Sequence, residues 1–197
     1  MAGHPKNIIF LSCDAFGVLP PIARLTPGQA MYHFISGYTA KVAGTERGVT
    51  EPSATFSACF GAAFLALHPT RYAELLRDKL EAHDARAWIV NSGWSGGPYG
   101  VGKRMSIGTT RGCVNAILDG ELDGEKMTWE ADPTFGWEIP AAVPGVDPEV
   151  LRPRNTWPDP KGYDEAEGKL AAMYVENFEK YAGKGDTDYT RFGPVAK

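Results

Sequence analysis

The sequence predicts an α/β fold in which a mixed sheet is flanked by helices and is incomplete. Short apolar runs typical of buried strands alternate with amphipathic helical segments along the 197 residues. The composition, 43% hydrophobic and 22% charged, is that of a folded globular chain. The first strand lacks an upstream partner and the last helix has few strands to cover, which is expected of part of a larger sheet.

Charge and cysteine content restrict the possible partners and compartments. The formal net charge of −4 gives no electrostatic support for binding nucleic acid. The three cysteines, Cys13, Cys59 and Cys113, form no C-x-x-C pair, so neither a zinc knuckle nor a disulfide framework is expected. No apolar run has the length of a signal peptide or a membrane span. We therefore expect a cytoplasmic location, no nucleic-acid partner and no membrane partner.

The first apolar run, residues 8–11, predicts a buried strand. Asp14 follows its C-terminal end, where open α/β sheets place their ligands. A catalytic role and a turn-forming role are both open for this carboxylate. Pro20 and Pro21 are expected to block regular structure in the residues that follow.

Capping residues predict the first two helices. The segment TPGQ at 26–29 combines an N-cap residue, a proline for the first turn and a glutamine for a capping box. Residues 39–55 are polar and contain glycine, which indicates a long loop, and residues 56–60 fit a short strand. A second helix is expected over residues 69–83, where apolar side chains recur in helical register.

The segment 93–104, GWSGGPYGVGKR, holds five glycines followed by two cations, and it comes after a predicted strand at 87–91. Strand, glycine loop and helix is an arrangement that presents backbone N–H groups to a phosphate. Residues 97–103 almost match the motif G-x-x-x-x-G-K-[ST], but Arg104 occupies the final position. A guanidinium binds phosphates and stacks on bases but cannot ligate a cation, which disfavours a self-contained P-loop kinase.

The C-terminal third contains the clearest helix of the chain, expected over residues 164–181 with a continuous apolar stripe. Before it, residues 125–146 are typical of short strands and turns, and residues 147–162 are rich in proline and expected to be irregular. The polar tail, residues 183–197, is expected to fray.

Several long strings resemble the C-terminal part of ATP-dependent phosphoenolpyruvate carboxykinases, in the order that this family has them. They are FLSCDAFGVLPP at 10–21, SGYTAK at 36–41, GTERG at 44–48, FSACFG at 56–61, VNSGW at 90–94, GKR at 102–104 and PRNTW at 153–157. The resemblance implies that residues 1–182 are the C-terminal portion of the family's mononucleotide-binding catalytic domain. Residues 183–197 remain as a polar tail.

The resemblance also implies an activity and its cofactors. The family is a carboxy-lyase of gluconeogenesis that converts oxaloacetate and ATP to phosphoenolpyruvate, ADP and CO₂. It uses Mg²⁺ with the nucleotide and Mn²⁺ at the substrate. Of its functional residues, those matching Arg104, Met105 and Thr110 line the adenine and ribose side of the ATP site.

Simpler structural roles stay open for two of these three residues. Met105 also fits a place in the core, and Thr110, like Thr109, also fits a cap for the helix that follows the glycine loop. We assign no catalytic residue, since both roles stay open for Asp14, and we expect no metal ligand because none of the four histidines has metal-ligand spacing.

The family's phosphate loop, acidic metal-binding motif, manganese ligands and oxaloacetate-binding arginines are not found in these 197 residues. We therefore expect a fragment that needs the missing N-terminal half of the enzyme and is inactive by itself. The alternative is a non-catalytic nucleotide-binding or interaction module derived from the same scaffold. A sheet interrupted in this way is also expected to leave an unpaired strand edge.

Overall fold

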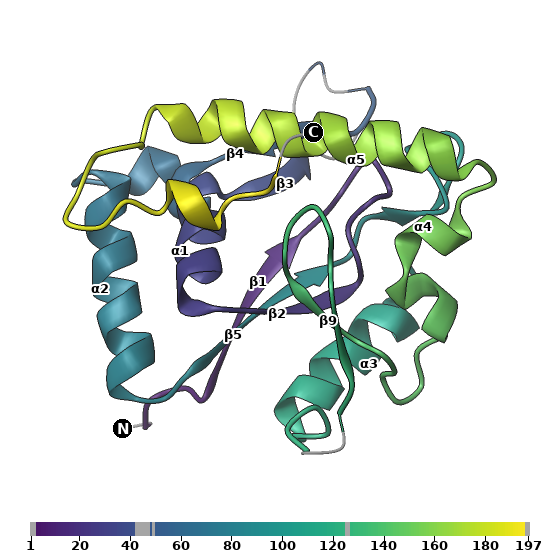
Figure 1. Cartoon of the computed structure of the whole chain (residues 1–197), viewed down its shortest axis with the longest axis horizontal. Helices are drawn as coiled ribbons and strands as arrows, with labels where there is room; N and C mark the ends of the chain where they lie inside the picture. Colours follow the sequence, from purple (N-terminus) through teal and green to yellow (C-terminus); the bar gives the residue numbers. More distant parts are fainter. Residues whose placement is uncertain (1–2, 42–47, 49, 125–126, 196–197) are drawn as a thin grey trace.

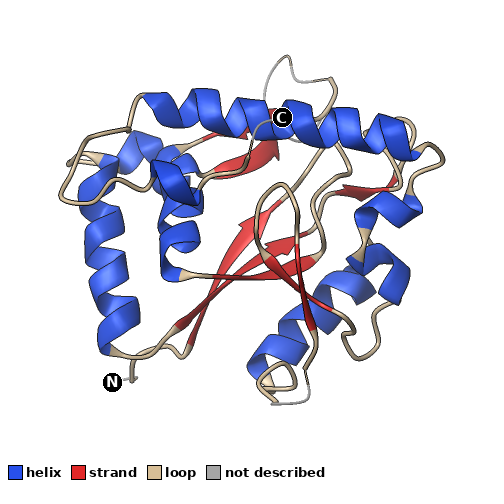
Figure 2. Ribbon diagram, viewed as in Figure 1, coloured by secondary structure: helices blue, strands red, loops and turns tan. Residues whose placement is uncertain are grey.

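The computed structural model describes residues 3–41, 48, 50–124 and 127–195. A five-stranded mixed sheet lies at its centre, in the order β1-β5-β2-β9-β8 (Figures 1 and 2). Its strands are β1 (Asn7–Ser12), β2 (Ile22–Leu25), β5 (Arg86–Asn91), β8 (Trp129–Ala131) and β9 (Glu138–Pro140). β1 and β5 are parallel, and the other neighbours are antiparallel. The predicted α/β class with a mixed sheet is confirmed.

Helices flank this sheet on both faces. They are α1 (Pro27–Ser36), α2 (Pro69–Ala82), α3 (Ile107–Leu118), the one-turn α4 (Pro153–Thr156) and α5 (Pro160–Glu179). α1 and α2 lie on one face and α3 on the other, while α5 crosses the carboxyl ends of β1 and β5 (Figure 1). The ring of Phe10 on β1 lies 5.9 Å from that of Phe34 on α1. On the opposite face, Asn7 Nδ2 donates to the carbonyl oxygen of Ile117 on α3 (3.5 Å).

The helix ends follow the capping chemistry of the sequence. Thr26 and Gln29 form the predicted capping box of α1, and Gly37 ends this helix in the left-handed region at φ 58°. α2 begins and ends within one residue of the predicted bounds. α5 begins four residues earlier than predicted, because the side chain of Asp159 accepts hydrogen bonds from the backbone of Lys161 and Gly162.

Three short strands and one 3-10 turn occur where the sequence predicts other structure. The expected loop over residues 39–55 contains a hairpin of β3 (Tyr38–Lys41) and β4 (Ser53–Phe56); its residues 42–47 and 49 lie outside the described part. The strand expected at 56–60 is wrong, because a 3-10 turn occupies Ala58–Phe60. β2 was not expected after Pro20 and Pro21, yet four residues suffice to pair with β5.

The segments expected to be irregular or frayed are more ordered than predicted. Residues 147–162 contain a 3-10 helix (Pro148–Leu151) and α4, which corrects the expectation of an irregular segment. The prediction that the tail frays is also wrong for the described residues from 186 onward. The Tyr189 side chain is 2% exposed, Arg77 donates to its hydroxyl (3.3 Å), and Val195 N donates to the carbonyl oxygen of Thr134 (2.9 Å).

Within the residues described, no helix combines the length and hydrophobicity that crossing a membrane requires.

The turn that follows β1 is organised by the buried carboxylate of Asp14. Its Oδ1 accepts from Phe16 N (2.9 Å) and from the Tyr38 hydroxyl (2.7 Å). Its Oδ2 accepts from Val18 N (2.7 Å) and Leu19 N (3.0 Å). All four partners are donors, so both oxygens must be acceptors. The turn-forming interpretation of Asp14 is therefore the one that the structure supports.

A second buried polar group, His33, lies on α1 among aromatic rings. Its Nδ1 is 3.3 Å from the Tyr174 hydroxyl, whereas Nε2 is buried and has no hydrogen-bond partner among the described residues. The ring meets Trp137 edge-on at a centroid distance of 5.7 Å. Burial lowers the pKa of His33 to about 3, because this environment cannot solvate the imidazolium.

Replacing Asp14 with asparagine should destabilise the fold strongly. The amide NH₂ would face two of the four donors, so at least two hydrogen bonds to a charged acceptor would be lost. We expect the free energy of unfolding to fall by about 3 kcal/mol or more, measured by urea denaturation. Asp119→Asn, at the exposed end of α3, is the control and should change it little. Equal effects of the two substitutions would contradict this role for Asp14.

The stability of the chain should fall on acidification, partly through His33. Its pKa is lower in the folded state than the usual 6.5, so this contribution is present above pH 6.5 and is lost progressively as the pH falls toward 3. The slope from this group is at most about 1.4 kcal/mol per pH unit. In His33→Leu the decline between pH 7 and pH 5 should be shallower, measured by urea unfolding across this range. Identical slopes would exclude the contribution of His33.

Candidate functional site

The glycine loop leaves the carboxyl end of β5 and folds into a small hairpin before α3 begins. β6 (Trp94–Ser95) pairs with β7 (Lys103–Arg104), so that Trp94 lies opposite Arg104. The predicted order of strand, glycine loop and helix is confirmed. However, Lys103 and Arg104 belong to a strand and do not sit on the first turn of the helix, as the lysine of a P-loop would.

The start of α3 corrects the predicted helix cap. Ser106, not Thr109 or Thr110, is the N-cap residue; it has extended backbone angles, and its Oγ accepts from Thr109 N (2.9 Å). Thr110 lies inside the helix, and its hydroxyl donates to the carbonyl oxygen of Ser106 (3.4 Å). The capping signal was ambiguous because three hydroxyl residues occur within five positions.

A cleft of about 390 Å³ lies between this hairpin, the first turn of α3 and the segment before α5. Hydroxyl groups, a short apolar wall and two cationic residues border it. Its lining residues are Ser95, Gly96, Val101, Gly102, Lys103, Arg104, Met105, Ser106, Thr109, Val150 and Thr156. Arg104 and Met105 thus border one cavity, whereas Thr110 is absent from its lining and Thr109 takes part instead.

The guanidinium of Arg104 is held by neutral groups. Its Nε donates to the carbonyl oxygen of Ser92 (3.2 Å), Nη2 lies 3.9 Å from the Cys13 sulfur, and Cζ is 5.6 Å from the centroid of the Trp94 ring. Among the described residues, no carboxylate forms an ion pair with it. Its positive charge therefore remains available to an anionic or aromatic ligand.

The Cys13 thiol beside Arg104 stays protonated at neutral pH. Burial raises the pKa of this thiol; the charge of Arg104 opposes the rise, and the charge of Asp14 adds to it. The thiol consequently contributes no negative charge that would neutralise the guanidinium.

Backbone contacts fix the position of Met105. Its N–H donates to the carbonyl oxygen of Gly93 (2.8 Å), and its side chain is half-buried at the wall of the cleft. Gly93 itself must be glycine, because a Cβ at this position would collide with the backbone of Asp14. The loop that carries the cleft is thereby held against the end of β1.

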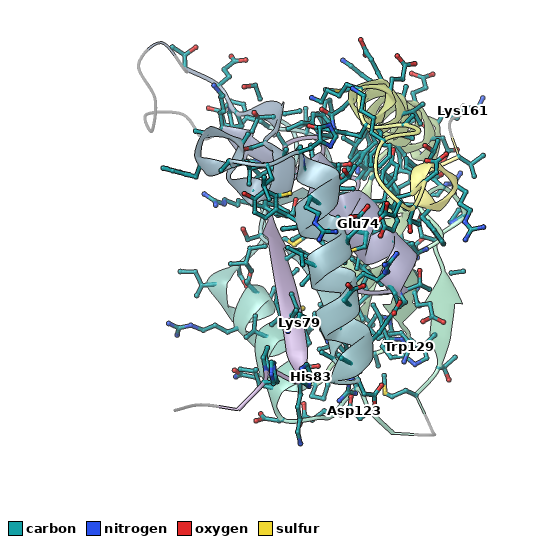
Figure 3. All side chains as sticks on the ribbon, turned by 90° about the vertical axis from the view of Figure 1, so that its left-hand side faces the viewer. Glu74, Lys79, His83, Asp123, Trp129 and Lys161 are labelled. Atoms are coloured by element: carbon teal, nitrogen blue, oxygen red, sulfur yellow. The ribbon has the colours of Figure 1, made fainter. Side chains whose placement is uncertain are left out.

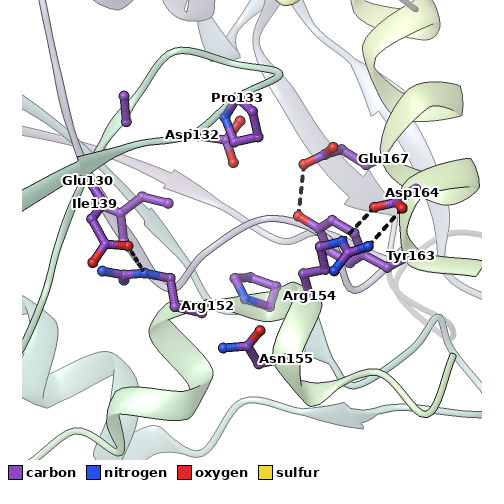
Figure 4. Close-up of a pocket in the computed structure, with 12 residues that line it drawn as sticks. Glu130, Asp132, Pro133, Ile139, Arg152, Arg154, Asn155, Tyr163, Asp164 and Glu167 are labelled. Atoms are coloured by element: carbon purple, nitrogen blue, oxygen red, sulfur yellow. Dashed lines mark hydrogen bonds and ion pairs between the residues drawn. The ribbon is translucent and has the colours of Figure 1, made fainter. Parts of the chain in front are cut away.

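A second, larger cleft of about 900 Å³ lies between β8, α4 and α5 (Figure 4). Two arginines project into it, each paired with a carboxylate. Arg154 donates to both oxygens of Asp164 (2.7 and 3.0 Å), and Arg152 Nε donates to Glu130 (2.6 Å). The hydrogen bond from Arg152 also holds the pKa of Glu130 below its usual range.

The inner wall of this larger cleft carries the buried carboxylate of Glu167. It accepts from the Thr134 hydroxyl (2.6 Å) and lies 2.8 Å from the Tyr163 hydroxyl (Figure 4). Burial, reinforced by the charge of Glu167, raises the pKa of Tyr163 well above its usual value. Sequence reasoning missed this cleft, although the string PRNTW at 153–157 supplies three of its lining residues.

In the described ranges, no three His, Cys, Asp or Glu side chains are grouped so that they could hold a metal ion. We therefore name no residue among those described as a ligand for either of the two metals that the family resemblance implies.

Comparison with known sequences places the chain in a family. The sequence profile described as phosphoenolpyruvate carboxykinase matches residues 1–149. Similar curated proteins are named phosphoenolpyruvate carboxykinase (ATP). That of Campylobacter jejuni strain 81-176 is 58% identical over 194 residues, 98% of this chain and 37% of the relative. That of Geotalea uraniireducens is 62% identical over 181 residues, which are 92% of this chain and 34% of the relative. That of Parvibaculum lavamentivorans is 56% identical over 195 residues, which are 99% of this chain and 36% of the relative.

The chain spans about a third of the length of these curated relatives, so its α/β sheet and helices form a partial domain of such a protein. The match covers most of the chain and includes the glycine loop, the hairpin with Arg104 and the whole of α3. On this evidence the chain belongs to the ATP-dependent phosphoenolpyruvate carboxykinase family.

Proposed function

We propose that this chain supplies the adenine and ribose side of the ATP site in an ATP-dependent phosphoenolpyruvate carboxykinase. The complete enzyme would convert oxaloacetate and ATP to phosphoenolpyruvate, ADP and CO₂. The observation that carries the proposal is the 390 Å³ cleft whose border includes Arg104, a guanidinium without a carboxylate partner among the described residues. Family membership supports the choice of ligand.

Each proposed contact residue offers a group that suits a nucleoside. Arg104 can donate to a phosphate or ribose oxygen, or lie over the face of the base. Met105 offers a polarisable apolar wall. Thr110 offers a hydroxyl one turn further along α3, and it would have to rotate away from the Ser106 carbonyl to reach a ligand.

The smaller cleft is favoured over the larger one on electrostatic grounds. Both arginines of the larger cleft already pair with carboxylates, and buried Glu167 adds further negative charge there. A nucleotide phosphate would have to displace these carboxylates. At the smaller cleft, Lys103 and Arg104 both border the cavity, and the aminoterminal turn of α3 adds its positive dipole end.

The groups that carry out phosphoryl transfer and decarboxylation are proposed to come from polypeptide outside this chain. We therefore assign no metal-binding or catalytic role to its residues, and we expect it to be inactive alone. The alternative, a non-catalytic nucleotide-binding module, would share the cleft but would not support turnover in any assembly. A cytoplasmic location remains a prediction.

Nucleotide binding can be mapped on the chain itself by titrating the ¹⁵N-labelled protein with ATP. We expect weak binding, with the largest chemical-shift changes at Arg104, Met105 and Thr110. Arg104→Ala should weaken binding by about tenfold or more, the usual effect of losing a hydrogen bond to a charged group. Arg111→Ala removes the same charge from an exposed position on α3 and should leave binding unchanged.

Two results would contradict the proposal. One is a set of shift changes centred on the larger cleft, at Arg152 and Arg154. The other is tight, magnesium-dependent ATP binding by this chain, since that would require a phosphate cradle which we place elsewhere.

A further inference from the structure

The larger cleft contains a buried carboxylate whose hydrogen-bonding capacity the protein fills only in part. Glu167 is 6% exposed, and the hydroxyl groups of Thr134 and Tyr163 contact its oxygens at 2.6 and 2.8 Å. The Tyr163 hydroxyl has one proton, and the carbonyl oxygen of Val18, at 3.1 Å, competes for it. By comparison, Asp14 accepts four hydrogen bonds. Glu167 therefore keeps acceptor capacity at the wall of the cleft.

No basic side chain among the described residues forms an ion pair with Glu167. Arg154 borders the same cleft, but it already donates two hydrogen bonds to a neighbouring carboxylate. Of the two lysines on α5, Lys161 is exposed at the outer surface of the molecule (Figure 3). The other, Lys169, has its Nζ over the Phe16 ring, 5.6 Å from the centroid. A buried carboxylate without an ion-pair partner favours a cation that comes from outside this chain.

The charged groups that border the cleft also favour a cation. They are four carboxylates and two guanidinium groups, those of Glu130, Asp132, Asp164, Glu167, Arg152 and Arg154. Figure 4 shows Glu130 and Arg152 on one side of the cleft and Asp164 and Glu167 on the other. Because each arginine pairs with one carboxylate, the lining keeps an excess of negative charge.

The shape and lining of the cleft indicate an organic cation. Its volume of about 900 Å³ lies in the range of small-molecule sites, and Ala131, Pro133 and Pro153 give it apolar surface. In the part of the chain that the structure describes, the carboxylates are not grouped as ligands for a metal ion. An alkyl ammonium suits both features, because its stem can lie on apolar surface while its three N–H groups donate to oxygens.

We propose that the larger cleft binds an aliphatic primary ammonium ion. Its N–H groups would donate to Glu167 and to the hydroxyl oxygens of Thr134 and Tyr163. Its hydrocarbon stem would lie along Pro133 and Pro153. A free amine and a lysine side chain from polypeptide outside this chain carry the same group, so the binding chemistry is shared. The inference does not use the smaller cleft and is independent of the proposed function.

Titration of the ¹⁵N-labelled chain with butylammonium, 1-butanol and butanoate, at equal ionic strength, tests the preference for positive charge. The three compounds are similar in size and differ in charge. Butylammonium should give saturable chemical-shift changes at residues 131–134 and 163–167, and 1-butanol should bind there about tenfold more weakly or less. Butanoate should give no saturable change. The proposal is overturned if butylammonium does not bind there, or if either other compound binds as tightly.

A matched pair of substitutions tests the role of the buried carboxylate. Glu167→Gln keeps the size of the side chain and an oxygen for the Thr134 hydroxyl, and it should weaken butylammonium binding about tenfold or more because the charge is removed. Glu165→Gln, at an exposed residue of α5 outside the cleft lining, should leave binding unchanged. Equal effects would contradict the proposal. If Glu167→Gln does not fold, as judged by its amide spectrum, the comparison of the three compounds on the unaltered chain decides.

A full-length chimera, in which this chain replaces the matching 194 residues of the Campylobacter jejuni relative, identifies the source of the ammonium group. If the chimera binds butylammonium and Glu167→Gln abolishes this, the ligand is a free amine. If it does not bind, and a lysine outside this chain loses its protection from reductive methylation in Glu167→Gln, that lysine is the occupant. No binding and no such lysine would overturn the proposal for the complete protein. None of these results depends on ATP, so this proposal and the proposed function can fail separately.

Discussion

The fold depends on one buried carboxylate. Asp14 gathers four donors around two oxygens, and this fixes the turn after β1 and ties it to β3 through Tyr38. Asn91 at the end of β5 completes the arrangement: its Oδ1 accepts from the backbone of Asp14 and Gly93, and its Nδ2 donates to the carbonyl oxygen of Leu19. The carboxyl ends of the two parallel strands are thus joined by direct hydrogen bonds. Each oxygen of Asp14 accepts two hydrogen bonds from the protein. This saturated arrangement suits a carboxylate that holds a turn in place better than one that accepts a proton from a substrate.

This scaffold explains why the adjoining loop presents a cation. Gly93 allows the chain to pass close to Asp14, and the hairpin that follows brings Arg104 back over Cys13 and Trp94. The partners of Arg104 are neutral, so its direction is set without cancelling its charge. In the larger cleft the opposite holds, since Arg152 and Arg154 each face a carboxylate. Geometry alone would favour the larger cavity, but the distribution of charge favours the smaller one for an anionic ligand.

Sequence reasoning succeeded where a local interaction determines the structure. The capping box at Thr26, the apolar stripe of α5 and the order of strand, loop and helix around the glycines are all encoded within a few residues. It failed where contacts between residues far apart in the sequence determine the structure. β2 forms because β5 and β9 pair with it on either side. The tail is ordered because Arg77 and Thr134 form hydrogen bonds with it. Arg104 and Met105 border one cleft and Thr110 does not, and the nucleotide-binding role of all three stays a prediction. The larger cleft could not be found, since it combines three segments that no periodicity connects.

The parallel pairing of β1 and β5 has a kinetic consequence. The Trp88 indole donates to the Asn7 side chain across 81 residues of sequence, and the Tyr163 hydroxyl donates to the carbonyl oxygen of Val18 across 145. Long loops must close before such contacts form, and closing them costs chain entropy that local helices do not pay. Topologies with many distant contacts fold slowly. During synthesis, β1 therefore stays unpaired, as an uncharged and largely apolar segment, until β5 has been made. A chaperone that shields such segments would favour correct folding over aggregation.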